Sequence, residues 1–173
     1  SVWEIWGALL YGGTLHVLPH FVSRSPVEFY QYISTHNITV LNQTPSAFSQ
    51  LIAHETQLSN PLPLSLRYVI FGGEALNLNS LTPWFNRHSD QFPKVINMYG
   101  ITETTVHVTY CQITQSTVSE EKGSIIGQRI PDLRTYILNS CLEPVPVGVY
   151  GELYVGGAGV SCGYLNRAAL TKE

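Results

Sequence analysis

The stretch Leu66–Ala75, LRYVIFGGEA, places an apolar run directly before two glycines. The run from Leu66 to Phe71 is rich in β-branched and aromatic residues, which favours a buried strand. Gly72 and Gly73 end this strand, since paired glycines mark a turn. We expect a helix over Leu78–Arg87 after the turn. The stretch therefore predicts one strand–turn–helix unit of an α/β fold.

The same alternation of strands and helices extends to both sides of this stretch. Strands that alternate with helices form parallel sheets with right-handed crossovers, so we predict a doubly wound, mostly parallel sheet. An apolar helix over Ser1–Leu10 opens the chain. The other expected elements are strands at Thr14–Leu18, Ile38–Leu41 and Lys94–Asn97, and helices at Val27–Ser34 and Ser46–Glu55.

The pattern changes after Gly100, where no long helix is expected. Strand-like segments follow at Thr105–Ile113, Leu133–Leu138 and Glu152–Val155, separated by Pro and Gly. They predict an antiparallel portion, part of a β-barrel-like subdomain. Arg167–Glu173 is polar, with no strand or helix expected. We therefore divide the chain into an α/β nucleotide- and substrate-binding portion, 1–113, and a β-rich portion, 114–173, both parts of one incomplete domain.

Composition excludes several classes of protein. The 173 residues are 44% hydrophobic, which suits a globular core. The net charge is −3 and the nine lysines and arginines are scattered, which excludes nucleic-acid binding driven by phosphate neutralisation. No apolar run approaches the roughly 20 residues of a membrane-spanning helix. Cys111, Cys141 and Cys162 fit neither a disulfide framework nor a zinc site, which favours a reducing, cytoplasmic location.

Two segments that follow expected strands carry the candidate chemistry, because ligands of open α/β sheets bind beyond the carboxyl ends of the strands. Gly72 and Gly73 allow a backbone to approach a ligand closely, although a tight turn accounts for them equally well. The second segment, Asn97–Thr105, reads NMYGITETT. An amide can pair with a base edge, a Tyr ring can stack, Thr hydroxyls can donate to phosphate, and a carboxylate suits magnesium. This mixture predicts a nucleotide site, with a Thr-rich turn as the structural alternative.

A third glycine-rich segment, Gly151–Leu165, reads GELYVGGAGVSCGYL. Neither Gly-Lys-Ser, Gly-Lys-Thr nor an expected helix follows its glycines, so it is not a Walker loop. We interpret it as a β-turn or bulge. The six histidines show no metal-ligand spacing, and the sequence has no Gly-x-Ser-x-Gly nucleophile elbow.

Together these motifs resemble a known family. NMYGITETT resembles the Asn-x-Tyr-Gly-Pro-Thr-Glu core of adenylate-forming enzymes, specifically the adenylation domains of nonribosomal peptide synthetases. GELYVGGAGVSCGYL and SVWEIWGALLYGG resemble further core segments, and YVIFGGEAL and VLNQTPSAF fall between them in the family's order. Ile101 stands where Pro is usual, and Cys162 where Arg is usual. The resemblance spans essentially the whole chain and implies the large N-terminal domain of these enzymes.

The resemblance implies amino-acid activation. ATP and an amino acid would give aminoacyl-AMP and pyrophosphate, and the aminoacyl group would pass to a phosphopantetheine thiol on a peptidyl carrier domain. A condensation domain would be a further partner in the parent synthetase. The family's phosphate loop, its ammonium-binding Asp, its ribose-binding Asp and its catalytic Lys would lie outside this chain. We therefore expect an internal fragment that does not turn over alone.

The resemblance also implies roles for individual residues. Tyr99 would stack on adenine, and Asn97 would contact its exocyclic amine. Thr102 would bind the α-phosphate and Glu103 would hold Mg²⁺, and these two are the expected catalytic residues. The full set implied for the nucleotide is Gly73, Glu74, Ala75, Asn97, Tyr99, Gly100 and Thr102, the first three through their backbone.

A set of side chains along the same segments matches the family's amino-acid pocket. Its pattern resembles that of threonine-activating domains, with an apolar wall for a methyl group. Asn42 and His107 would bond a hydroxyl, and serine is the expected competitor; as the alternative, both are satisfied structural polar residues. The matching residues are Trp3, Asn42, Ile70, Gly72, Met98, Val106 and His107.

Two other functions stay open at this point. An acyl-CoA or aryl-acid ligase of the same superfamily shares the nucleotide motifs. A degenerate, non-catalytic interaction domain could keep the fold without the reaction, although intact Asn97, Tyr99, Thr102 and Glu103 argue against it.

Overall fold

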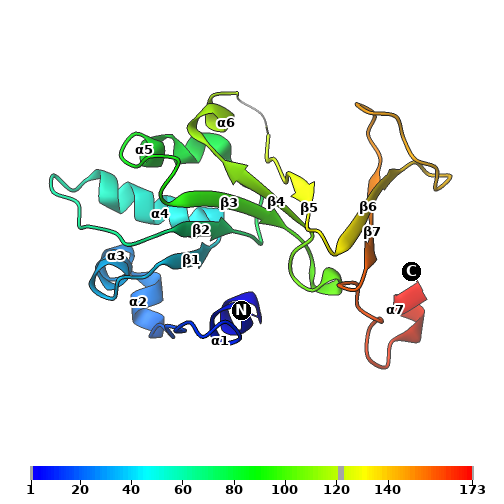
Figure 1. The fold of residues 1–173 in the computed structure, drawn as a ribbon, viewed down its shortest axis with the longest axis horizontal. Coiled ribbons are helices and arrows are strands. Elements are labelled where there is room, and N and C mark those ends of the chain that lie inside the picture. Colours follow the sequence, from blue (N-terminus) through cyan, green and yellow to red (C-terminus); the bar gives the residue numbers. More distant parts are fainter. Residues whose placement is uncertain (1, 121–122, 173) are drawn as a thin grey trace. The chain divides into compact units, whose positions relative to one another are not determined.

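The computed structural model describes residues 2–120 and 123–172. The chain forms two compact units, a first unit of residues 1–98 and 111–127 and a second unit of residues 99–110 and 128–173. The expected division into 1–113 and 114–173 stays a prediction about domain organisation. The helices are α1 (Val2–Leu9), α2 (His20–Arg24), α3 (Pro26–Thr35), α4 (Pro45–Thr56), α5 (Thr82–Phe85), α6 (Gln115–Ser119) and α7 (Ala168–Lys172), with 3₁₀ turns η1 (Leu78–Leu81) and η2 (Thr102–Thr104) (Figure 1). The strands are β1 (Val40–Gln43), β2 (Tyr68–Phe71), β3 (Lys94–Tyr99), β4 (Thr109–Ile113), β5 (Gln128–Arg129), β6 (Leu133–Leu138) and β7 (Glu152–Gly157).

Parallel strands form the centre of the first unit. β1 pairs with β2 and β2 with β3, both in parallel, with Asn42 opposite Ile70 and Ile70 opposite Ile96 (Figure 1). The sheet has the order β1-β2-β3-β4-β5. The predicted mixed α/β fold with a mostly parallel sheet is confirmed.

The two faces of these strands differ in burial, because successive side chains of a strand point to opposite faces. Leu41, Val69, Phe71 and Val95 are buried in one hydrophobic core with residues of α3, α4, η1, α5 and α6. Phe48 of α4 lies at the centre of this core, its ring centroid 5.1 Å from that of Phe71 and 4.9 Å from that of Trp84. The opposite face is only partly covered.

Local sequence explains where the longest helices begin. Ser25 accepts a hydrogen bond from the Glu28 amide and precedes Pro26, the first residue of α3. Thr44 accepts one from the Ala47 amide and precedes Pro45, the first residue of α4. A hydroxyl cap followed by proline is a strong helix start, since proline lacks only an amide that has no helical partner there. The helices predicted at Val27–Ser34 and Ser46–Glu55 are confirmed, as is the opening helix over its described residues.

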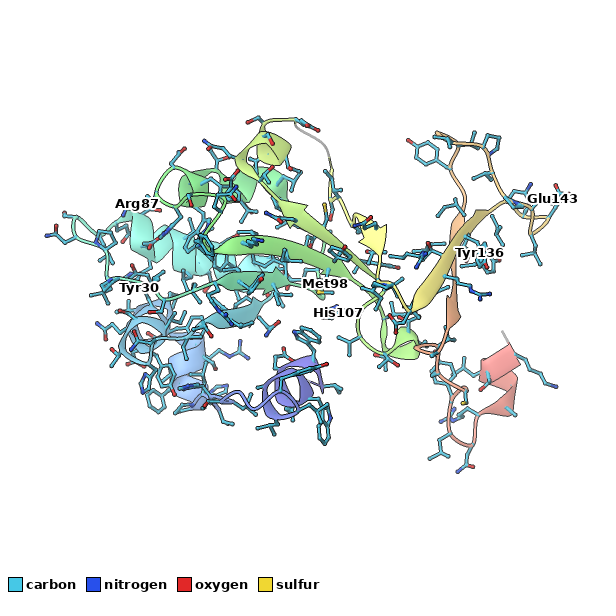
Figure 2. The ribbon with its side chains drawn as sticks, viewed as in Figure 1. Tyr30, Arg87, Met98, His107, Tyr136 and Glu143 are labelled. Atoms are coloured by element: carbon cyan, nitrogen blue, oxygen red, sulfur yellow. The ribbon has the colours of Figure 1, made fainter. Side chains whose placement is uncertain are left out.

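One buried carboxylate that is not among the predicted site residues lies at the end of α4. Glu55 is 1% exposed and accepts hydrogen bonds from the Tyr30 hydroxyl at 3.0 Å and from His88 Nε2 at 2.9 Å. Arg87 donates to the carbonyls of Glu55 and Thr56, at 3.0 and 2.8 Å, so it caps the helix (Figure 2). Burial alone would raise the pKa of Glu55, but the hydrogen bond and charge of His88, with Tyr30 and Arg87, hold it below its ordinary value.

Antiparallel pairing distinguishes the second unit, as predicted. β6 pairs with β7 along its whole length, with Tyr136 opposite Tyr154, and Figure 2 labels Tyr136 on this ribbon. β4 also pairs antiparallel with β5, Thr109 opposite Arg129. The strands expected at Leu133–Leu138 and Glu152–Val155 are confirmed, the second continuing to Gly157.

Several expected elements differ in the structure. Thr14–Leu18 is not a strand: no described strand pairs with it, and Val17 is 80% exposed. The helix expected at Leu78–Arg87 is split into η1 and α5, because Pro83 lacks an amide and its ring clashes with the preceding turn. The polar end expected to lack structure forms α7 over Ala168–Lys172.

The other differences concern strand boundaries. The strand expected at Ile38–Leu41 begins two residues later, at Val40, and takes in polar Asn42 and Gln43. The strand expected at Thr105–Ile113 begins only at Thr109. Among the described residues, no helix has the length and apolar character needed to cross a membrane.

Candidate functional site

In the first unit, three predicted substrate residues lie on the partly covered face of the parallel strands. Asn42 of β1 and Ile70 of β2 are register partners, so their side chains share a face. Ile96 is the partner of Ile70 on β3, and Met98, two residues further on, points to the same side (Figure 2). Asn42, Ile70 and Met98 are half-buried. The structure thus brings these predicted residues to one face, at the carboxyl ends of adjacent strands.

A hydrogen bond joins a fourth predicted substrate residue to this face. Trp3 of α1 donates its indole Nε1 hydrogen to Asn42 Oδ1 at 3.0 Å. An indole nitrogen only donates, so Trp3 uses one of the two lone pairs of Oδ1 and sets the orientation of the amide. The Nδ2 hydrogens of Asn42 then point away from Trp3. The hydrogen bond thereby makes the expected role of Asn42 more specific, since Nδ2 can donate to a hydroxyl oxygen of a ligand.

The Gly72–Ala75 segment follows β2 directly. Gly73 has φ +83°, a left-handed conformation that favours glycine. The carboxylate of Glu74 accepts hydrogen bonds from Ser46 Oγ at 2.9 Å and the Ser46 amide at 3.1 Å, at the start of α4. These bonds lower the pKa of Glu74. The side chain of Glu74 is held at the helix, so the exposed backbone of Gly73 to Ala75 is the part of the segment open to a ligand. Its contact with a nucleotide stays a prediction.

Asn97 of β3 carries a buried acceptor without a donor. It is 2% exposed, and its Nδ2 donates to the Ile125 carbonyl at 2.7 Å, which fixes the orientation of the amide. Its Oδ1 is buried and has no hydrogen-bond partner among the described residues. An unsatisfied buried acceptor costs about 1–3 kcal/mol. A ligand that brings an N–H group to Oδ1 would remove that cost.

The second unit begins with Tyr99 and Gly100 at the end of β3. Tyr99 is 40% exposed, and its carbonyl accepts a hydrogen bond from the Val108 amide at 2.7 Å. Gly100 packs against the backbone of the returning chain. A Cβ atom at this position would contact the Val106 carbonyl and lie 2.7 Å from His107 Cα. Only glycine therefore allows the two segments to approach this closely.

Between Gly100 and His107 the chain makes a 3₁₀ turn and then a strained turn. In η2, the hydroxyl of buried Thr104 donates to the Ile101 carbonyl at 3.0 Å, whereas the side chain of Thr102 is exposed. Thr105 and Val106 then have φ of +56° and +75°. The His107 amide donates to the Thr105 carbonyl at 3.0 Å, which closes a γ-turn centred on Val106.

A γ-turn at positive φ is rare, and for a β-branched residue the conformation is strained. Such strain clusters at functional sites. Here Val106 is the central residue of the turn and His107, labelled in Figure 2, is its last. These are the two predicted substrate residues of the second unit. Both side chains are half-buried. The conformation also explains why Thr105–Val108 is not part of β4.

Glu103, the predicted magnesium ligand, is held by the third glycine-rich segment. Its carbonyl accepts a hydrogen bond from the Ser161 amide at 2.8 Å, and its carboxylate accepts one from the Tyr164 hydroxyl. Next to it, Thr105 Oγ1 donates to the Gly159 carbonyl at 2.7 Å. The bond from Tyr164 lowers the pKa of Glu103 and raises that of Tyr164. Glu103 is therefore an ionised carboxylate at neutral pH.

The chemistry of Glu103 fits magnesium. Mg²⁺ is typically held by one or two carboxylates together with the phosphates of a substrate, rather than by an all-protein cage. Among the described residues, no group of three or more His, Cys, Asp or Glu side chains is placed to hold a metal ion. A single half-buried carboxylate beside the exposed hydroxyl-bearing turn is thus a suitable donor for a cation that arrives with a nucleotide.

Sequence reasoning found these segments but missed two of their contacts. It treated Trp3 only as part of an apolar wall, without the bond to Asn42. It interpreted the third glycine-rich segment as a turn, without the bond from Tyr164 to Glu103. The Gly-Tyr-Leu signal at the end of that segment was visible in the sequence, but nothing in it named the partner.

Comparison with protein families decides the classification. A model of the family described as AMP-binding enzyme matches residues 1–165. The chain belongs to the AMP-binding enzyme family. Within that family, its curated relatives include malpinin synthetase of Mortierella alpina, 60% identical over 173 residues, and a dimodular nonribosomal peptide synthase of Bacillus subtilis, 56% identical over 174 residues. Syringomycin synthase SyrB1 of Pseudomonas syringae pv. syringae is 49% identical over 173 residues.

The chain is short beside these relatives. All of it is covered in the three alignments, but it spans only 2%, 7% and 28% of the respective proteins.

Solved structures give the same classification for this AMP-binding chain. The nonribosomal peptide synthetase FmoA3 matches 99% of the chain with a TM-score of 0.87 and 26% identity, over 18% of its own length. A nonribosomal peptide synthetase protein containing adenylation and PCP domains matches 98% of it with a TM-score of 0.82 and 28% identity, over 33% of its own length. A four-domain synthetase bound to AMP and glycine matches 94% with a TM-score of 0.77 and 31% identity, over 11% of its length. These matches agree with the predicted resemblance to adenylation domains.

Proposed function

We propose that the chain is part of an adenylation domain that activates an amino acid, threonine, as aminoacyl-AMP for nonribosomal peptide synthesis. The observation that carries this function is the buried Oδ1 of Asn97, which accepts no hydrogen bond from the residues that the structure describes. The exocyclic amine of adenine is a donor that would satisfy this oxygen. The exposed ring of Tyr99, two residues on, offers a face on which a base would stack. Membership of the AMP-binding enzyme family supports the same assignment.

The reaction needs positioning and charge neutralisation more than covalent help. A carboxylate oxygen of the amino acid attacks the α-phosphorus of ATP, and the bond from that phosphorus to the pyrophosphate oxygen breaks. The exposed Thr102 hydroxyl would donate to an α-phosphate oxygen, and Glu103 would hold Mg²⁺. When bound, Mg²⁺ supplies positive charge to the phosphate oxygens. The aminoacyl group would then pass to the phosphopantetheine thiol of a carrier domain, with release of AMP.

The Trp3–Asn42 bond supports threonine as the amino acid. It leaves the Nδ2 donors of Asn42 for the side-chain oxygen of the substrate, while Ile70 and Met98 on the same face offer apolar contact for a methyl group. A site built to bond a hydroxyl rejects an analogue without one by roughly 10⁴–10⁵-fold, whereas a missing methyl costs only about 10–200-fold. We therefore expect valine to be rejected strongly and serine to be the best competitor.

Amino-acid-dependent ATP–pyrophosphate exchange by the full-length protein tests both the adenylation reaction and the preference for threonine. Threonine, serine, valine and allo-threonine are compared side by side. The highest kcat/KM with threonine is the expected result. A different preferred amino acid would retain adenylation and refute threonine. Exchange only with an aliphatic or aryl acid would identify an acyl ligase, and a folded protein without exchange would favour an interaction domain.

The proposed contact between Asn97 and the adenine amine has its own test, which needs no mutation. ITP carries a carbonyl in place of the adenine amine, so it would place an acceptor opposite the Oδ1 acceptor of Asn97. A buried unpaired acceptor costs about 1–3 kcal/mol, and we expect kcat/KM for ITP to fall about 10–100-fold below that for ATP. Equal use of ITP and ATP would show that Asn97 does not bind the amine.

A further inference from the structure

The glycine-rich segment after β7 has a defined set of contacts in the second unit. The Ser161 amide bonds the Glu103 carbonyl, and Thr105 Oγ1 bonds the Gly159 carbonyl. These two bonds hold the backbone of the segment against the η2 turn. The Tyr164 hydroxyl, by contrast, hydrogen-bonds only the carboxylate of Glu103 among the described residues. The hydroxyl is therefore not needed to fix the path of the segment.

The position of Tyr164 is itself fixed by the short helix that follows. Its amide donates to Thr171 Oγ1 at 3.0 Å, and that hydroxyl donates in turn to the Arg167 carbonyl at 3.1 Å. Gly163 has φ +129°, and a Cβ there would lie 2.8 Å from Thr171 Oγ1. The glycine thus allows the chain to pass Thr171 closely, and the tyrosine begins from a constrained backbone.

We propose that Tyr164 is a positioning residue that orients the Glu103 carboxylate toward Mg²⁺, resting on the proposed role of Glu103 as the magnesium ligand. The hydroxyl donates to Oε1, which fixes the rotation of the carboxylate and leaves lone pairs of both oxygens for a cation. Groups that hydrogen-bond a metal ligand orient it before the metal arrives, and their removal costs about 10–100-fold in affinity or activity. Tyr164 does not touch the metal or the substrate in this role.

The experiment measures metal binding directly in the full-length protein. The dissociation constant of Mn²⁺ from the enzyme–ATP complex is determined by electron paramagnetic resonance without amino acid, for wild type and Tyr164→Phe. The matched control is Tyr154→Phe in β7, a tyrosine of similar exposure (37% against 42%) whose hydroxyl bonds none of the described residues. We expect about tenfold weaker Mn²⁺ binding for Tyr164→Phe, a similar rise in half-saturating Mg²⁺ for exchange, and no change in KM for the amino acid. Tyr154→Phe should match wild type.

A double-mutant cycle with Glu103→Gln separates the positioning role of Tyr164 from the metal-binding role of Glu103. If Tyr164 acts through Glu103, its substitution adds no further loss of Mn²⁺ affinity in the Glu103→Gln background. Unchanged Mn²⁺ binding in Tyr164→Phe, with weakened binding in Glu103→Gln, would overturn the role of Tyr164 alone. Unchanged binding in Glu103→Gln would overturn the metal role of Glu103, and the role of Tyr164 with it. Additive losses would show that Tyr164 acts independently of Glu103, which also overturns it.

Discussion

Replacing Gly100 with alanine should disable the second unit's part of the site while leaving the fold intact. The new Cβ would lie 2.7 Å from His107 Cα and 2.8 Å from Val106 C, and would contact the Val106 carbonyl oxygen. All three are backbone atoms, so no side-chain rotation relieves the contact. To reach an ordinary contact of 3.4 Å, the His107 backbone must move away by about 0.7 Å. The γ-turn at Val106 therefore has to shift or open.

Two magnitudes follow from that displacement. Overpacking of this kind costs about 1–3 kcal/mol of stability, and each kcal/mol lowers Tm by about 2–4 °C in a domain of 150–250 residues. A misplacement of about 1 Å at a reacting site costs about 10²-fold in rate. We expect Gly100→Ala to lower kcat/KM for threonine-dependent exchange by up to about 10²-fold, with Tm lowered by a few degrees.

The matched control is Gly156→Ala in β7. An added Cβ at Gly156 meets no atom within 4 Å, and the residue does not have positive φ. It introduces the same methyl group into open space, so exchange and Tm should stay near wild type. If Gly100→Ala were as active and as stable as Gly156→Ala, the close approach at Gly100 would be irrelevant and the steric reasoning would be wrong.

Two further predictions concern the first unit. Glu55→Gln removes a buried charge bonded by His88, and since hydrogen bonds to charged groups contribute about 1.5–3 kcal/mol, the free energy of unfolding should fall by about 2 kcal/mol. The pKa of Glu55 lies below its ordinary 4.5, so the difference in the free energy of unfolding between wild type and variant should be full above pH 4.5 and shrink as the pH falls further. Urea denaturation at several pH values would measure this difference. A difference that does not change with pH would contradict the prediction. Trp3→Phe releases the Asn42 amide, so the preference for threonine over valine in exchange should fall about tenfold, whereas Trp6→Phe on the same helix should leave it unchanged.

Much of the first unit is predictable because local and global signals agree. Ser25-Pro26 and Thr44-Pro45 mark helix starts by their hydrogen-bonding chemistry alone, and both helices bury an apolar face. Phe71 ends an apolar run at two glycines, and the strand ends there. Thr14–Leu18 has an equally plausible pattern, but a strand needs a partner and the fold provides none there among the described strands.

The site is less predictable because its decisive features are not local. The β-branched residues Thr105 and Val106 favour a strand, but they form a strained turn at positive φ. The hydrogen bond that closes this turn forms only when the chain is folded. The orientation of the Asn97 amide, whose Oδ1 has no donor within the described part of the chain, depends on the Ile125 carbonyl, 28 residues away. Tyr164 contacts Glu103 across 61 residues. Residue types at motif positions are visible in the sequence, whereas pairings over such separations are set by topology.

The unequal burial of the two faces of the parallel strands bears on which sequence changes the protein can tolerate. Leu41, Val69 and Phe71 are fixed by the core, while their neighbours Asn42 and Ile70 face away from it. If the proposed function holds, a substitution on the second face should alter selectivity without disturbing packing. An insertion or deletion of one residue within β2 would exchange the two sets at once, placing Ile70 in the core and Phe71 outside. Natural or laboratory diversification of this chain should therefore proceed by replacement of side chains at constant strand length.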